Sequence, residues 1–173
     1  MAKTNEKVEI KGTVIAVKEN VYSGVKLVYI SHNLVTNDGD KYYAQMASGE
    51  SPTDDFDNST AGIHLGQGTT GGGDKTDTGV NTEDTRGRQT LTANYEKTND
   101  TDADNTGAGV DIVTWLYSYT TTEGNVTKCN EGAIVNSLTG ASKALTHFDF
   151  GSTFDKTSSD TLKIFINHTM NGV

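Results

Sequence analysis

An aspartate-rich run near residue 100 has the residue types and spacing of a calcium-binding loop. Asp100, Asp102 and Asp104 occupy alternate positions in NDTDADNTGAGVD, and Asp111 comes eleven residues after Asp100. Oxygen ligands at loop positions 1, 3, 5 and 12 suit calcium, which prefers hard donors. Position 6, however, is Asn105 where a calcium loop has glycine, and no helix pair flanks the run. The run is a candidate calcium site, and a solvated acidic turn would show the same pattern.

Other residues with chemical potential lack the neighbours that catalysis needs. The Gly-rich run GQGTTGGGDKT has two glycines at P-loop spacing, but Asp74 stands where a P-loop has lysine. The histidines stand singly on strand-like segments, where we expect them at the surface or at the edge of the core: His32, His64, His147 and His168. Cys129 has no motif around it, so no nucleophile triad is defined. We therefore predict that the protein is not an enzyme and, calcium aside, has no cofactor.

Charge and cysteine content restrict the partners. Against 23 acidic residues the chain has 14 basic ones, a formal net charge of -9, so phosphate backbones should repel it and we expect no nucleic-acid partner. The single cysteine excludes an intramolecular disulfide and cysteine-based zinc clusters. We find neither a signal peptide nor an apolar stretch long enough to span a membrane, and expect no membrane partner.

The segments that must position these residues have mostly strand character. Hydrophobic residues make up only 33%, with 19 glycines and one proline, which favours strands and turns over helices. Apolar alternation predicts strands at 7–17, 24–30, 61–66, 110–120, 143–150 and 161–170, with a weaker one at 132–137. A 3.6-residue period predicts one short helix at 40–49, capped by the run 37–40 and packed through Tyr43, Met46 and Ala47. Because few helices separate the strands, we predict a mainly β fold, an antiparallel, jelly-roll-like β-sandwich.

The chain divides into an arm and one domain. Residues 1–6 are predicted to be a flexible arm, and residues 7–173 a single β-sandwich domain. Residues 50–109 carry few large apolar groups, so we expect long Gly/Thr-rich surface loops there. Loops of this length in a compact domain usually have a role or are ordered by a partner.

Four segments together resemble a module of tailed-bacteriophage virion proteins, found in head decoration (cement) proteins, head fibres and tail-fibre-related proteins. HNLVTNDGDKYYAQMASG (32–49) is similar to its strand-to-helix opening, and IHLGQGTTGGGDKTDTGVNTEDTR (63–86) to its Leu-Gly-x-Gly-Thr stretch, with Glu83 and Arg86 in the final acidic and arginine places. NEGAIVN (130–136) resembles its Glu-x-Gly strand, and ALTHFDFGSTFDKTSSDTLKIFINHTMNG (144–172) its closing hairpin. Residues 87–109, which include most of the aspartate-rich run, match nothing in the pattern.

The resemblance implies a non-enzymatic structural protein of the virion. We expect a capsid decoration protein that is made in the bacterial host cytoplasm, docks on the head surface and stabilises the shell by binding across its subunits. Its expected partners are the major capsid protein and further copies of itself. A fibre or receptor-binding component of the virion is the first alternative, and a calcium-dependent binding module the second. The expected contact residues lie in the arm and two loops: Met1, Ala2, Lys3, Thr4, Asn5, Glu6, Asp54, Asp55, Phe56, Gln67, Thr69 and Thr70.

Overall fold

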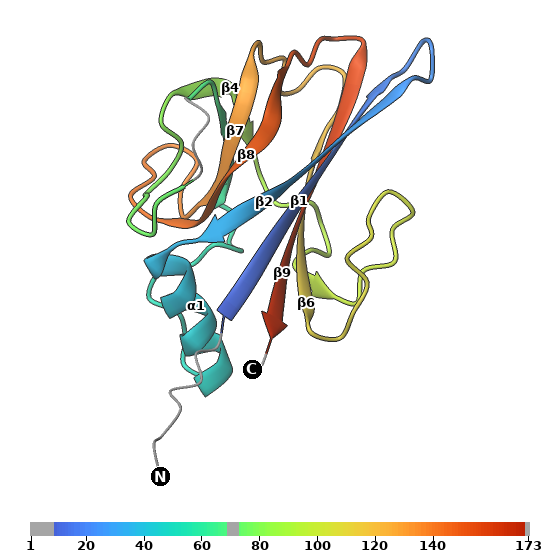
Figure 1. Ribbon diagram of the computed structural model, residues 1–173. Helices are drawn as coiled ribbons and strands as arrows, with labels where there is room; N and C mark the ends of the chain where they lie inside the picture. Colours follow the sequence, from blue (N-terminus) through green and yellow to red (C-terminus); the bar gives the residue numbers. More distant parts are fainter. Residues whose placement is uncertain (1–8, 69–72, 172–173) are drawn as a thin grey trace.

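A computed structural model of the protein describes residues 9–68 and 73–171 (Figure 1). The elements in chain order are β1 (Glu9–Asn20), β2 (Lys26–Val35), α1 (Asn37–Ser48), β3 (Gly62–Gly66), β4 (Glu83–Gln89), β5 (Lys97–Thr98), β6 (Ile112–Tyr119), β7 (Cys129–Val135), β8 (Ala144–Phe154) and β9 (Asp160–Asn171). The strands form one antiparallel sheet in the order β4-β3-β7-β8-β2-β1-β9-β6-β5, curled into a half-barrel. The predicted mainly β fold with one short helix is therefore confirmed.

The predicted sandwich of two separate sheets is not confirmed, because one narrow junction joins the strands into a single sheet. β2 pairs with β8 only where Asn33, Leu34 and Val35 lie opposite the segment 146–148. On one side of this junction lie β4, β3, β7 and β8, and on the other lie β2, β1, β9, β6 and β5. Strand periodicity shows which residues share a face but not which strand edges meet, so the sequence could not reveal this junction.

The main core lies between the two halves of the curled sheet. Trp115 and Tyr117 of β6 are fully buried there with Phe148 of β8. On the opposite face of β6, Leu116 packs with Phe165 in a smaller cluster. The alternation predicted for residues 110–120 is therefore real, but both faces of the strand are buried.

Helix α1 begins three residues earlier than predicted, because Thr36 caps it. The Thr36 hydroxyl accepts a hydrogen bond from the Gly39 backbone N–H (3.1 Å), and Gly49 ends the helix at φ 74°. The predicted packing face is only partly right. Tyr42 is its most buried side chain, whereas Met46 stays 47% exposed.

Sequence patterning missed β4 and β5 within the predicted loop region. β4 has the sequence EDTRGRQ, which shows no apolar alternation, and β5 is only two residues long. Both are edge strands, where charged side chains and short length are common, so neither shows the apolar alternation of a core strand. Within residues 9–68 and 73–171, no helix is long and apolar enough to cross a membrane.

Candidate functional site

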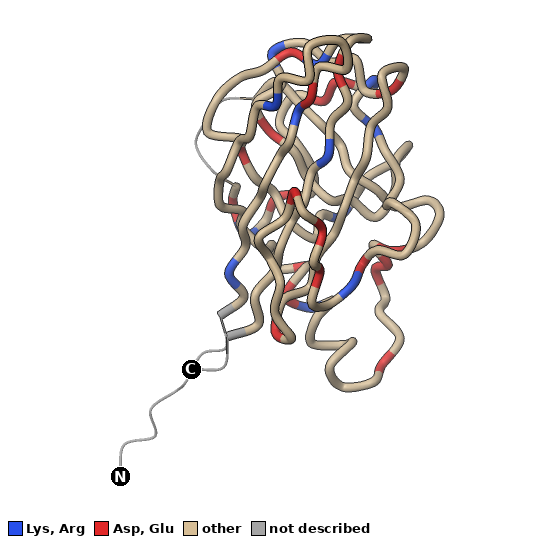
Figure 2. The backbone as a smooth tube through the Cα atoms, turned by 90° about the vertical axis from the view of Figure 1, so that its right-hand side faces the viewer, with Lys and Arg blue, Asp and Glu red and all other residues tan. Residues whose placement is uncertain are grey.

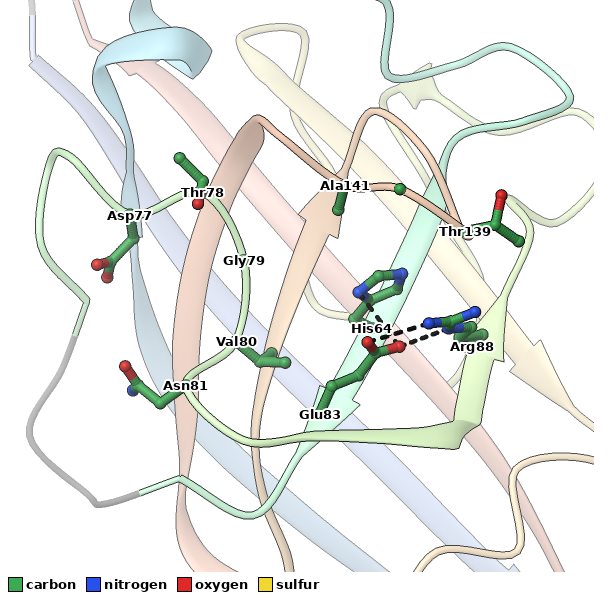
Figure 3. Close-up of a pocket in the computed structure, with 11 residues that line it drawn as sticks. His64, Asp77, Thr78, Gly79, Val80, Asn81, Glu83, Arg88, Thr139 and Ala141 are labelled. Atoms are coloured by element: carbon green, nitrogen blue, oxygen red, sulfur yellow. Dashed lines mark hydrogen bonds and ion pairs between the residues drawn. The ribbon is translucent and has the colours of Figure 1, made fainter.

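An open, polar pocket of about 530 Å³ lies beside β3 and β4 (Figure 3). His64 and Glu83 line it from these strands, Arg88 closes one side, and the segments 77–81 and 139–141 form the rest of its wall. The residues come from four separate stretches of the chain, so folding alone brings them together.

His64, Glu83 and Arg88 form a chain of polar contacts in this pocket. Arg88 Nε and Nη2 donate to the two carboxylate oxygens of Glu83 at 2.5 and 3.1 Å. His64 is 4% exposed; its Nε2 lies 3.1 Å from the Leu138 carbonyl, and its Nδ1 lies 3.5 Å from Glu83 Oε1. Burial lowers the pKa of His64, while the hydrogen bond from Arg88 lowers the pKa of Glu83. At neutral pH we therefore expect a neutral imidazole beside a charged carboxylate.

This geometry suits binding better than acid–base catalysis. Because Arg88 already holds both oxygens of Glu83, that carboxylate is a weak base with little freedom to move. If His64 donates from Nε2 to the Leu138 carbonyl, its Nδ1 lone pair remains available to accept a hydrogen bond from a ligand. The pocket thus offers acceptors and a fixed guanidinium to a polar molecule.

A carboxylate–histidine–carboxylate cluster lies next to the pocket, with His147 and Glu131 buried and Asp77 partly exposed. His147 Nδ1 lies 2.6 Å from Asp77 Oδ2, and His147 Nε2 lies 3.0 Å from Glu131 Oε2. Glu131 also accepts hydrogen bonds from Asn81 Nδ2 (3.0 Å) and from the Thr82 backbone N–H (2.9 Å). The cluster therefore ties the segment 77–82, one wall of the pocket, to strands β7 and β8.

Mutual hydrogen bonding keeps this cluster charged. Burial would raise the pKa of Glu131, but hydrogen bonds from His147 and the backbone outweigh it and lower the pKa to about 2. Burial would likewise lower the pKa of His147, but its bonds to Glu131 and Asp77 raise it. Both imidazole nitrogens then carry protons and both are used. The arrangement fixes a wall and leaves no free base on His147.

The aspartate-rich run is neutralised by lysines. Asp100 is 1% exposed and lies 2.7 Å from Lys97 Nζ, while Lys163 Nζ lies 3.5 Å from Asp102 and 3.1 Å from Asp104. Lys26 also contacts Asp104, at 3.0 Å, whereas no described side-chain contact joins Asp111 to the other three aspartates. Over 9–68 and 73–171, no three His, Cys, Asp or Glu side chains gather around a point where a metal could bind.

The predicted contact residues are only partly at the surface. Asp54 and Asp55 lie in an exposed loop, and Gln67 Nε2 donates to the Thr127 carbonyl at 2.7 Å. Phe56, however, is fully buried, with its ring edge-on to Tyr42 at 5.5 Å, so as a contact residue it was wrongly chosen. The sequence signal for this burial was the aromatic character of Phe56, since a large apolar ring among aspartates is expected to pack into the core. Residues 1–6, Thr69 and Thr70 lie outside the described residues.

Three of the four histidines are buried, which the sequence analysis did not anticipate. His168 is fully buried with Nδ1 2.6 Å from the Tyr43 hydroxyl, and burial lowers its pKa to about 3. His64 and His147 belong to the pocket and its wall. The resemblance includes Glu83 and the segment 130–136, which contains Glu131, but nothing local in the sequence links these glutamates to histidines. Cys129 is also buried, which raises its pKa to about 12 and leaves it a poor nucleophile.

Compared with protein-family models, with curated proteins and with solved structures, the chain matches none of them.

Proposed function

We propose that this protein is a non-enzymatic structural component of a tailed-phage virion, a decoration protein that docks on the capsid surface and binds the major capsid protein. The sequence resemblance supplies the virion context. In this proposal the two halves of the curled sheet correspond to the two layers of the sandwich that the resemblance implies.

The observation that carries the structural role is an exposed apolar surface on the β1–β2 hairpin. We call this surface the apolar hairpin; it comprises Val21, Tyr22, Val25, Leu27, Val28 and Ile30, each 46–85% exposed. In Figure 1 the hairpin extends away from the body of the molecule. Exposed apolar side chains gathered on one hairpin indicate a protein–protein contact site, because leaving them in water is unfavourable. An exposed surface that contacts other proteins supports a structural role in a shell rather than a catalytic one.

The copy number of the chain in purified virions tests this function. Quantitative mass spectrometry should find it in amounts comparable to the major capsid protein, since decoration repeats at every equivalent position of the shell. Virions that lack the chain would overturn the proposal. In reconstitution on undecorated heads, Tyr22→Ser should weaken binding, while the control Val110→Ser, at an exposed residue outside the apolar hairpin, should not.

A fibre or receptor-binding component of the virion is the second candidate, and the polar pocket at His64 favours it. A pocket that offers hydrogen-bond acceptors beside a guanidinium fits a polar receptor group such as a sugar. A low copy number per virion, together with loss of host-cell attachment in Arg88→Met, would favour this candidate over decoration.

A further inference from the structure

Among residues 9–68 and 73–171, no strand pairs with one long edge of β2. β1 pairs with β2 along almost its whole length, from Lys26 to Asn33, but on the other side β8 pairs only with residues 33–35. The ring of Tyr29 stacks on Phe154 of β8 at 4.8 Å, so side chains fill the inner side of this opening. Residues 26–32 therefore form a free strand edge, although β2 is an interior strand in the order of the sheet.

The backbone groups on this edge point outward in a fixed alternation. The Asn20 N–H donates to the Val25 carbonyl at 3.0 Å and the Gly24 N–H donates to the Asn20 carbonyl at 2.8 Å, which makes Asn20 a hydrogen-bonded position of the hairpin, opposite Gly24 and Val25. In an antiparallel ladder the hydrogen-bonded positions alternate, so Leu27, Tyr29 and Ser31 also bond to β1. Lys26, Val28, Ile30 and His32 consequently direct their backbone N–H and C=O groups away from β1, toward the free edge.

The two terminal edges of the sheet are protected, in contrast to this one. β4 carries Glu83, Asp84, Arg86 and Arg88 along its seven residues, and β5 is only two residues long. Charged or very short strands are common devices against edge-to-edge association. The free part of β2 is less protected, because Lys26 at its end is its only formally charged side chain and its outward-bonding positions include the apolar Val28 and Ile30.

Val28 and Ile30 also continue an apolar face of the sheet. Val28 lies directly opposite Val17, and Ile30 opposite Ile15. Residues opposite each other share a face, and Val17 and Ile15 belong to the buried cluster around Phe165. At Val28 and Ile30 this face reaches solvent with exposed fractions of 55% and 68%.

The hairpin that carries the edge is held in place before any partner binds. The Asn20 side chain accepts hydrogen bonds from the Tyr22 and Ser23 backbone N–H groups at 3.2 and 3.1 Å. Val21 N–H donates to the Ser159 carbonyl at 2.9 Å, which ties the turn to the body of the protein. A preorganised edge loses less conformational entropy on pairing.

Charge indicates which partner fits. Acidic and basic positions are interspersed along the backbone (Figure 2), yet within residues 21–32 the only formally charged side chain is Lys26. Lys26 already pairs with Glu19 and Asp104 inside the same chain. The edge therefore offers neither a positive nor a negative field to an oppositely charged partner. A surface that is neutral, apolar and strand-like matches itself.

We propose that the free edge of β2 pairs antiparallel with the same edge of a second copy, across a two-fold axis near Val28 and Ile30. Antiparallel pairing of identical strands is self-complementary, so backbone bonds form in both directions. Val28 and Ile30 of both copies then form one apolar cluster. This inference builds on the proposed function by naming the partner of part of the apolar hairpin, and leaves the hairpin tip free for the shell.

Sedimentation velocity of the purified full-length protein tests the pairing. Wild type should show a concentration-dependent monomer–dimer equilibrium. Ile30→Lys should weaken the dimer by at least about a hundredfold, because the two lysines would repel each other at the two-fold axis and break the apolar cluster with Val28. Val110→Lys is the matched control, because Val110 is an even more exposed apolar residue away from the edge, at 88%, and it should leave the dimer unchanged. Circular dichroism and thermal unfolding confirm that both variants fold.

Salt dependence gives a second readout. Raising NaCl from ~0.05 to ~0.5 M should strengthen the dimer, because salt screens the repulsion between two chains of net charge -9. A dimer that weakens with salt would point to a charged interface elsewhere and overturn the proposal. So would a wild type that stays monomeric at high concentration, or equal dimerisation of Ile30→Lys and Val110→Lys. A monomer that is nevertheless abundant in virions overturns only the pairing, while a dimer absent from virions overturns only the proposed function.

Discussion

Replacing Glu131 by glutamine should remove most of the stabilisation that the buried cluster supplies. The variant keeps the shape of the side chain but not its charge, so the His147 imidazolium loses one of its two carboxylates. The pKa of Glu131 is about 2 in the folded protein, against an ordinary value of 4.5. At about 1.4 kcal/mol per pKa unit this corresponds to roughly 3 kcal/mol at most, in line with the cost of breaking a buried ion pair.

The pH dependence of the effect separates charge from packing. A carboxylate whose pKa is lowered on folding stabilises fully above its unfolded pKa, and that stabilisation disappears as pH falls through its folded pKa. His147, whose pKa is raised, stabilises below its unfolded pKa and loses the effect as pH rises. The cluster should therefore contribute most between pH 4.5 and 6.5.

Urea unfolding of wild type and Glu131→Gln at two pH values measures this contribution. The difference in free energy of unfolding should approach ~3 kcal/mol near pH 5.5 and fall to roughly 1 kcal/mol near pH 3. Glu83→Gln serves as the control, since the Glu83–Arg88 pair is about a quarter to a third exposed and should contribute less than about 1 kcal/mol. A difference that is the same at both pH values, or absent at pH 5.5, would refute the electrostatic account of the cluster.

Three further outcomes follow from the same structure. Burial, and then nearby carboxylates, raise the pKa of Glu96 to about 7, so its ionised form opposes folding. Glu96→Gln should therefore increase the free energy of unfolding by roughly 2 kcal/mol above pH 7 and change it little at pH 4. Urea titrations that show the larger gain at pH 4 would contradict this. Gly12→Ala should destabilise by roughly 1–3 kcal/mol in thermal unfolding because a β-carbon there overlaps the Asn33 side chain, whereas Gly140→Ala, with open space around it, should be neutral; equal effects would be inconsistent with this packing. Millimolar calcium should barely change Tm, because Lys163 and its neighbours already neutralise the aspartate-rich run; a Tm that climbs steadily with calcium concentration would restore the calcium-module reading.

Local patterns were enough to locate most of the strands. Alternation over residues 110–120 and 161–170 found β6 and β9, and a helical period found α1 to within three residues. These patterns succeed because side chains repeat every two residues in a strand and about every 3.6 residues in a helix, whichever neighbours the element later meets. Composition likewise showed that the fold is mainly β and the charge strongly negative.

Tertiary structure decided how these elements combine. Asp77 lies far from Glu131 and His147 along the chain, and only the pairing of β7 with β8 and the path of the segment 77–82 bring both carboxylates within 3.0 Å of the His147 imidazole. The burial of Phe56, which the sequence placed among the contact residues, has the same origin: its place in the core depends on α1.

The amino-acid sequence by itself determined most of the strands, the one helix, the antiparallel arrangement and the acidic character of this protein, since these depend on residue type and short-range spacing. Only the tertiary structure decided that one sheet curls around the core, that the His147 cluster forms, and that part of β2 keeps a free edge. All three depend on which strand edges meet. That choice depends on contacts summed over the whole chain, and no local window of sequence contains it.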